Sequence, residues 1–307
     1  MRFRLRIIGW ILLIAAGSAA AKEPKLTFQK AHPRAVRRAI AAGREYGKIV
    51  KQQCGFQLIL IETEHFLIWT DWPAREHRRL AKLCERMYRS LARQFHLKPD
   101  QNIWVGKCPV FLFRETTRYN RFAKIMHHYE PKKAAGYCHQ RSDGRVHLVV
   151  ARRPRQTRLS FAEVICHEGT HAFLHRLWIP RPLIGWINEG LAEATSAELV
   201  RGSKKRARAL KASLQWARKG RALEPLLKHY KTSSPPGRFY PIAQTLVEYL
   251  IQQDRKAFRK LVFYLKHGVE AETALKKAYH FDYQELTRRW RNWVIRTAAQ
   301  GNRKRRR

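Results

Sequence analysis

Two histidines and an acid form the pattern H-E-x-x-H, at His167, Glu168 and His171. Residues four apart lie on one face of an α-helix, so both imidazoles can bind a single Zn²⁺ ion at about 2.0–2.1 Å. Glu168 lies beside them and can accept a proton from a metal-bound water, because the metal lowers the pKa of that water. The pattern therefore predicts a hydroxide that attacks a carbonyl group near neutral pH.

The plain alternative for this motif is a pair of surface histidines with a solvated glutamate between them, since the chain has 14 histidines. The neighbouring residues favour a buried helix instead. Such a helix has more apolar surface than an exposed basic helix needs. The apolar side chains that flank the motif are Leu159, Val164, Ile165, Phe173, Leu174 and Leu177.

Spacing excludes two other ligand sets. His175 continues the same row of the helix but lies about 12 Å from His167 along the axis, too far to share one metal ion. A metzincin would have glycine and histidine at positions 174 and 177, and this chain has leucine at both.

A second acidic run follows the motif, where residues 188–193 read N-E-G-L-A-E. With H-E-x-x-H, this run resembles the gluzincins, the thermolysin-like zinc metallopeptidases, and the peptidase MA-like domains of exported bacterial proteins. A catalytic zinc usually has three protein ligands and a water. The resemblance implies that Glu189 is the third ligand and that Glu193 accepts the other N–H of His167. The alternatives are a first-turn acid at a helix dipole for Glu189 and a surface charge for Glu193.

Residues 240–250 resemble a later segment of the same family, Y-x-x-A-x-(S/T)-x-V-x-Y-L. A tetrahedral intermediate needs an oxyanion donor besides the metal, and the resemblance implies Tyr240 for this role. The alternative is a packing tyrosine. The resemblance further implies that the strand over 146–150 pairs with an extended substrate and that residues 135–137 help to line the groove, the alternative being a core hairpin. It covers residues 56 to about 297 and implies a zincin-like fold.

The elements that must position these residues come as strands first and helices second, which is typical of the α+β class. We expect a small N-terminal mixed sheet with the active-site helix, followed by a mainly helical half. A capping box at Ser160 and Glu163 is expected to begin the active-site helix. The strands are expected over 56–61, 66–70, 109–113, 136–139 and 146–150. The helices are expected over 34–50, 74–95, 119–126, 158–178, from 187, within 201–221, and over 240–253, 255–266 and 283–297.

The N-terminus has the features of a secretory signal peptide over residues 1–21. Three arginines come first, an apolar run covers 7–16, and small residues follow. An uncleaved anchor is the alternative. We therefore expect an exported protein, periplasmic or extracellular, without a transmembrane domain in its mature form. Residues 22–55 are expected as a basic extension, 56–298 as the zincin-like domain and 299–307 as a disordered basic tail.

Five cysteines are present, so at least one has no partner within the chain. Cys166 is the expected unpaired one because it lies in the active-site helix. The other four, Cys54, Cys84, Cys108 and Cys138, are able to form two disulfides in an exported protein, in a pairing that the sequence does not decide.

The chain is strongly basic, with 63 Lys+Arg against 23 Asp+Glu and a net charge of +40. Apolar residues make up 45%, enough for a core, so generic disorder is excluded. No second long apolar run and no internal repeat occur, which excludes a polytopic membrane protein and a solenoid. The charge favours contact with anionic envelope polymers or lipids, or reflects surface composition alone. No motif of specific nucleic-acid binding is present.

Together these features predict an exported zinc-dependent hydrolase, a metallopeptidase acting on a peptide or protein substrate. Two alternatives stay open. One is a catalytically inactive zincin scaffold that binds polyanions of the envelope. The other is a non-peptide amide substrate, such as a cell-wall crosslink, because the chemistry at the metal would be the same.

Overall fold

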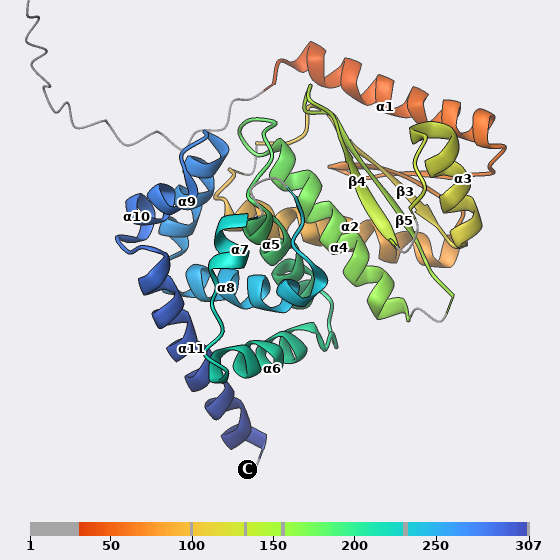
Figure 1. Ribbon diagram of the computed structural model, residues 1–307. Helices are drawn as coiled ribbons and strands as arrows, with labels where there is room; N and C mark the ends of the chain where they lie inside the picture. The colour runs from red at the N-terminus through yellow and green to blue at the C-terminus, as the bar shows by residue number, and fades with distance from the viewer. Residues whose placement is uncertain (1–30, 99–100, 132–133, 155–156, 230–232, 306–307) are drawn as a thin grey trace, which may run out of the picture.

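The computed structural model is of the mixed α+β class, with a sheet and its covering helices in one part and helices alone in the other (Figure 1). The predicted signal segment 1–21 lies outside the residues that the structure describes. The described residues are 31–98, 101–131, 134–154, 157–229 and 233–305. None of the helices in these ranges is long and apolar enough to cross a membrane.

Within the described ranges, five strands form one mixed sheet in the order β1-β2-β3-β5-β4. The central strands β2, β3 and β5 are parallel to one another, and the edge strands β1 and β4 pair antiparallel to their neighbours. All five were predicted from the sequence, with β1 beginning later than expected. The strands are β1 (Ile59–Glu62), β2 (Phe66–Thr70), β3 (Cys108–Phe113), β4 (Gly136–Gln140) and β5 (Val146–Ala151).

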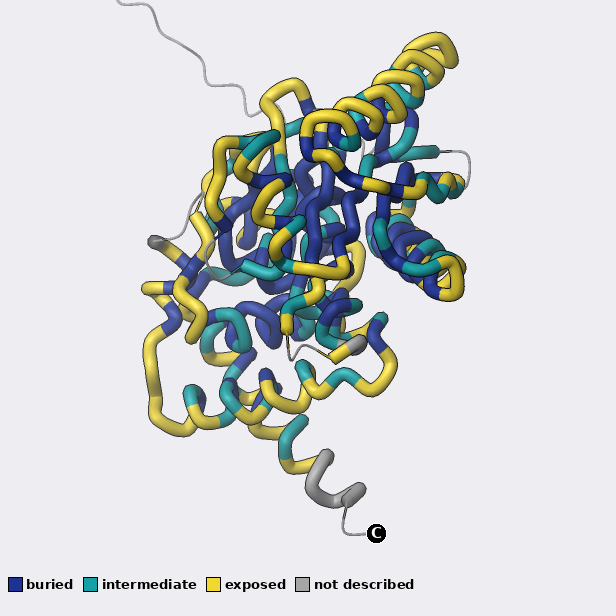
Figure 2. Tube along the Cα trace, turned by 90° about the vertical axis from the view of Figure 1, so that its right-hand side faces the viewer, coloured by how far each residue is buried: buried dark blue, intermediate teal, exposed yellow. Residues whose placement is uncertain are grey.

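Helices cover both faces of the sheet, because successive side chains of a strand point to opposite faces. Phe111 and Val149 pack under α1 (Pro33–Cys54) and α3 (Thr116–His127). Leu148 packs on the other face, with α2 (Ala74–Gln94) and α4 (Arg158–Arg176). Figure 2 shows the buried residues concentrated in these layers. The strands β2 and β5 are therefore buried along their whole length, which explains their continuous apolar sequences.

The helical part packs around α5 and α8, which lie against each other. Trp290 is buried within it and donates a hydrogen bond to Thr245 Oγ1 at 3.1 Å. The sequence analysis did not predict α7 and α10, which are short. Helix α11 continues to Arg305, into the segment predicted as a disordered tail. The helices are α5 (Gly185–Leu199), α6 (Lys205–Arg218), α7 (Glu224–His229), α8 (Tyr240–Gln253), α9 (Arg255–Lys266), α10 (Ala271–Tyr279) and α11 (Tyr283–Arg305).

The start of α4 differs from the predicted capping box. Thr157 is the N-cap, and its hydroxyl accepts a hydrogen bond from the backbone N–H of Ser160 at 3.1 Å. The carboxylate of Glu163 accepts a hydrogen bond from the hydroxyl of Ser203 instead of turning back to the helix end. The prediction of a box at Ser160 and Glu163 was therefore wrong, because a tertiary partner takes the glutamate.

All five cysteines are free, so the two disulfides that the sequence allowed are not formed. Cys54 lies in the apolar core on the α1 side of the sheet. Cys84, Cys108 and Cys166 lie in the core on the opposite side. The sheet thus separates Cys54 from these three thiols.

A buried lysine fixes the C-terminal end of α4. Lys266, at the end of α9, is fully buried. Its ammonium donates hydrogen bonds to the carbonyl oxygens of Leu174 at 2.8 Å, His175 at 3.0 Å and Arg181 at 2.6 Å. The last carbonyls of a helix have no partner within the helix, so Lys266 satisfies them and ties α9 to the segment between α4 and α5.

We expect Lys266→Met to lower the free energy of unfolding by about 3 kcal/mol, because three carbonyl oxygens, two of them buried, lose their donor. Urea unfolding of the purified protein measures this change. Lys256→Met, at an exposed position of the same helix, is the control and should change the free energy by less than about 0.5 kcal/mol. Equal effects of the two substitutions would contradict the structural role of Lys266.

Candidate metal centre

Helices α4 and α5 bring three potential metal ligands together. The Nε2 atoms of His167 and His171 lie 3.0 Å apart. Glu189 Oε2 lies 3.3 Å from the first of these nitrogens and 3.5 Å from the second. His171 and Glu189 are buried, and His167 is largely so. The two histidines share a face of α4 because they are one helical turn apart, and Glu189 projects from the first turns of α5.

The three atoms fit a transition-metal ion. Ligand atoms of a tetrahedral zinc with bonds of about 2.0–2.1 Å are about 3.3 Å from one another, and the three separations here lie between 3.0 and 3.5 Å. Glu189 Oε2 is buried and has no hydrogen-bond partner among the described residues. A buried carboxylate oxygen without a donor is costly. A metal cation held by His167, His171 and Glu189 would remove that cost.

The outer nitrogens of the two histidines face acceptors. His167 Nδ1 lies 3.1 Å from a carboxylate oxygen of Glu193, which also pairs with Lys205 at 2.9 Å. His171 Nδ1 lies 3.1 Å from Asn188 Oδ1. With Nδ1–H turned toward these oxygens, each Nε2 presents its lone pair to the centre. Glu193 therefore lies beside the outer nitrogen of His167.

Two residues of the helical part complete the surroundings of Glu189. Ser234 donates a hydrogen bond to Glu189 Oε1 at 2.6 Å and also contacts the hydroxyl of Tyr240. The ring of Tyr240, at the first position of α8, lies 6.5 Å from the ring of His167. Burial, followed by the charge of Glu189, raises the pKa of Tyr240 to about 12. Its phenol is therefore protonated near neutral pH and able to donate a hydrogen bond.

The electrostatics of the centre favour a positive charge. Burial opposes a charge on His167, but Glu189 and Glu193 outweigh it and raise its pKa to about 10. Burial likewise opposes ionisation of Glu189, and the two histidines hold its pKa well below the usual range. The pKa of Glu193 falls to about 2, because His167 and Lys205 outweigh the effect of burial. A proton on His167 or a metal cation would satisfy the two acids.

Two glycines permit the close packing that holds the ligands. A Cβ atom at Gly169, within the motif, would lie 2.0 Å from the sulfur of Met87 on α2. A Cβ atom at Gly190 would lie 2.4 Å from the carbonyl oxygen of Ala243 on α8. Any side chain would therefore push α4 from α2, or α5 from α8. The second contact also places the start of α8, with Tyr240, close to Glu189.

The predicted site residues come together in the structure. Glu168 is half-buried on α4 and faces the edge strand β4. A Cβ atom added to Gly136 of that strand would lie 3.1 Å from Cγ of Glu168. His175 lies outside the centre, as expected, and its Nε2 lies 3.0 Å from the carbonyl oxygen of Arg141.

The sequence analysis assigned no role to Asn188, Lys205 or Ser234. Only Asn188 had a usable signal, because it directly precedes Glu189 in the acidic run. Lys205 and Ser234 come from separate segments that the fold brings to the centre.

No protein-family model matches the chain, and no curated protein is significantly similar to it.

We expect His171→Ala to lose one equivalent of bound zinc relative to the wild-type protein, because the centre loses one of three ligands. Metal analysis after dialysis at neutral pH measures this difference. His175→Ala, one turn further along α4, is the matched control and should keep the wild-type zinc content. Equal zinc in the two variants would contradict the ligand assignment.

Proposed function

We propose that this protein is a zinc-dependent metallopeptidase of the gluzincin type, with a zincin-like fold. One observation carries the proposal. His167 and His171 converge on the buried Oε2 atom of Glu189, which has no hydrogen-bond partner among the described residues. The mixed sheet also supports it. Its antiparallel edge strand β4 lies beside α4, so an open strand edge and the proposed ligands are neighbours.

The residues around the centre have distinct roles in this proposal. Bound zinc would lower the pKa of a water molecule and polarise the scissile carbonyl. Glu168 accepts the proton of the attacking water and passes it to the amine that leaves. Tyr240, protonated near neutral pH, donates a hydrogen bond to the developing oxyanion. Glu193 and Asn188 keep the imidazoles of His167 and His171 in orientation.

An extended peptide fits the free edge of the sheet at β4. The strand over 146–150, which the sequence analysis assigned to substrate pairing, is internal and is paired with β3 and β4 on its two sides. That prediction was wrong, because the order of strands places β4 at the edge. A peptide that added a strand to β4 would pass Gly136, whose backbone lies against Glu168.

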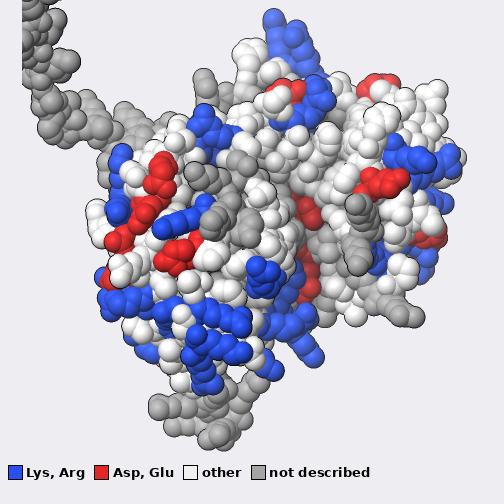
Figure 3. Space-filling view, in the orientation of Figure 1, with Lys and Arg blue, Asp and Glu red and all other residues white. Residues whose placement is uncertain are grey.

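In this proposal the protein is exported and works near anionic polymers or lipids of the cell envelope. The net charge after removal of residues 1–21 would be 40 − 3 = +37, since that segment holds three arginines and no acid. Figure 3 shows lysine and arginine side chains gathered over the lower part of the helical half, around α6. Anionic envelope polymers or lipids would bind there. The competing function is a scaffold that binds such polymers without hydrolysing a substrate. Peptidase activity of the zinc-loaded protein distinguishes the enzyme from this scaffold.

We expect Glu168→Gln to lower kcat for peptide hydrolysis by about 10³-fold, because the attacking water loses its proton acceptor. Zinc content should stay at the wild-type value. A peptide library screened with the zinc-loaded protein, followed by kinetics on the best substrate, provides the measurement. Glu198→Gln, at an exposed position of α5, is the control with unchanged activity. A zinc-loaded wild-type protein without any peptidase or amidase activity would favour the binding scaffold.

We expect Tyr240→Phe to lower kcat by about 10²-fold with little change in KM, since the hydroxyl acts on charge that develops in the transition state. Steady-state kinetics of the two enzymes test this difference. Tyr249→Phe removes a hydroxyl from the same helix at a buried position and should leave kcat unchanged. A Tyr240→Phe enzyme with wild-type kcat would show that this tyrosine only packs against His167.

A further inference from the structure

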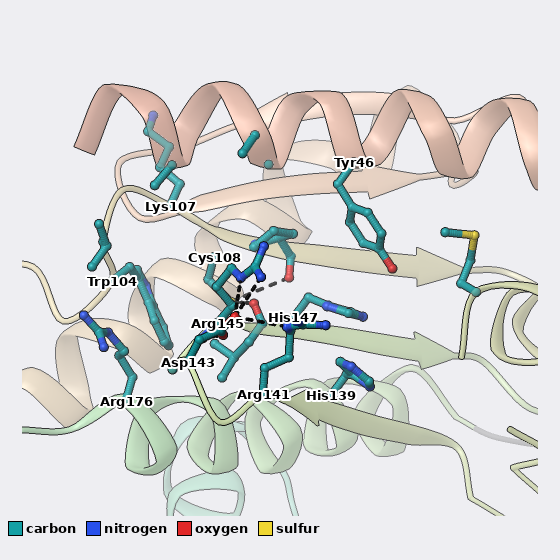
Figure 4. Close-up of a pocket in the computed structure, with 18 of the residues that line it drawn as sticks. Tyr46, Trp104, Lys107, Cys108, His139, Arg141, Asp143, Arg145, His147 and Arg176 are labelled. Carbon is teal, nitrogen blue, oxygen red and sulfur yellow. Dashed lines mark hydrogen bonds and ion pairs between the residues drawn. The ribbon is translucent and has the colours of Figure 1, made fainter. Parts of the chain in front are cut away.

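A cavity of about 540 Å³ lies on the face of the sheet opposite to α4, under α1 (Figure 4). Four histidines line it, and the rings of three of them, from three different elements, contact one another, whereas His128 belongs to no such contact among those described. His127 is the last residue of α3, His139 lies in the edge strand β4, and His147 lies in β5. The proposed metallopeptidase centre uses none of these residues, although His139 belongs to the edge strand β4.

The strand register brings two of the histidines together. His139 and His147 are direct partners across the β4–β5 pair, so both side chains project from the same face of the sheet. Figure 4 shows them at one end of the cavity, with Tyr46 of α1 pointing toward them. Their rings stack with centroids 4.8 Å apart, and the ring of His127 stacks on that of His139 at 4.1 Å.

The donor atoms of the three rings are close enough to share one ion. His127 Nε2 and His147 Nε2 lie 2.9 Å apart. One ring nitrogen from each of the three residues lies within 4.8 Å of the other two. An ion lies in the plane of each imidazole that binds it, so the His139 ring must turn out of its stack on His127 for the three nitrogens to reach the separations of about 3.3 Å that tetrahedral coordination requires.

Burial disfavours the charged form of all three imidazoles, and the neutral form is the one that binds metals. Burial, followed by the nearby His139, lowers the pKa of His127 to about 4. Burial also lowers the pKa of His139, and it lowers the pKa of His147 well below its usual value. Asp143, an acid that also lines the cavity, pairs with Arg145 at 2.7 Å and supplies no free carboxylate to the cluster.

Two further contacts resemble the surroundings of a metal site. His127 Nδ1 lies 2.7 Å from the hydroxyl of Tyr137, so donation of its N–H to that oxygen leaves Nε2 with its lone pair toward His147. The hydroxyl of Tyr46 lies 3.3 Å from the same Nε2, a contact that a bound ion would replace. Because α3 ends at His127, its last carbonyl groups also favour a cation at this point.

We propose that His127, His139 and His147 form a second metal site, which binds a divalent transition-metal ion that prefers imidazole ligands, such as Zn²⁺ or Cu²⁺. Three protein ligands leave at least one coordination position for water or a small anion from the cavity. The sheet separates this site from the proposed peptidase centre, so each can be removed without the other.

The test counts tightly bound Zn²⁺ per chain in the full mature protein after reconstitution and dialysis at neutral pH. A His171→Ala protein, which lacks the first centre, is expected to keep about one zinc. Adding His139→Ala is expected to remove it. Adding His128→Asn instead, at the neighbouring left-handed position that asparagine tolerates, should leave the zinc bound.

Two results would overturn the second site. A His171→Ala protein without bound zinc would show that the cluster holds no metal, and zinc that survives the addition of His139→Ala would place the ion elsewhere. Where His139→Ala does not fold, His139→Gln serves in its place, with thermal melting as the check of folding. Both results are independent of peptidase activity, because the first centre is disabled in every protein compared.

Discussion

Two imidazole nitrogens and a carboxylate oxygen face one another at 3.0–3.5 Å in a buried place, so a proton or a metal cation must lie among them to prevent repulsion between their lone pairs. This constraint explains the arrangement around α4 and α5. Glu193 faces the outer nitrogen of His167, Lys205 balances Glu193, and Ser234 supplies a hydrogen bond to the remaining oxygen of Glu189. These contacts leave Glu189 Oε2, which points at the two histidines, without a hydrogen-bond partner among the described residues.

The sheet divides the molecule into two chemical environments. On the α4 side, carboxylates surround histidines, and the pKa of His167 is raised. On the α1 side, histidines surround one another under a layer of aromatic rings, and their pKa values are lowered. The same residue type therefore presents opposite protonation behaviour on the two faces. The difference arises because acids are present on one side and desolvation dominates on the other.

The sequence was informative where the signal is local. H-E-x-x-H needs only the helical repeat, so residues 167–171 were placed correctly without knowledge of the fold. Strand and helix positions followed from apolar periodicity in the same way. The order of strands does not follow from periodicity, which is why β5 was taken for the substrate edge in place of β4. Lys205, Ser234 and the three-histidine cluster also escaped notice, because each contact joins segments distant in the chain.

The contact of Lys266 with the end of α4 couples unfolding of the C-terminal helices to the metal centre. The proposed zinc ligands span only residues 167–189, yet α8 packs on α5 through Gly190 and α9 holds the last turn of α4. Local opening of the C-terminal helices would therefore loosen the ligand set, and a bound ion would be released before the sheet unfolds. By thermodynamic linkage, metal binding would stabilise α8 and α9, although neither supplies a ligand to it.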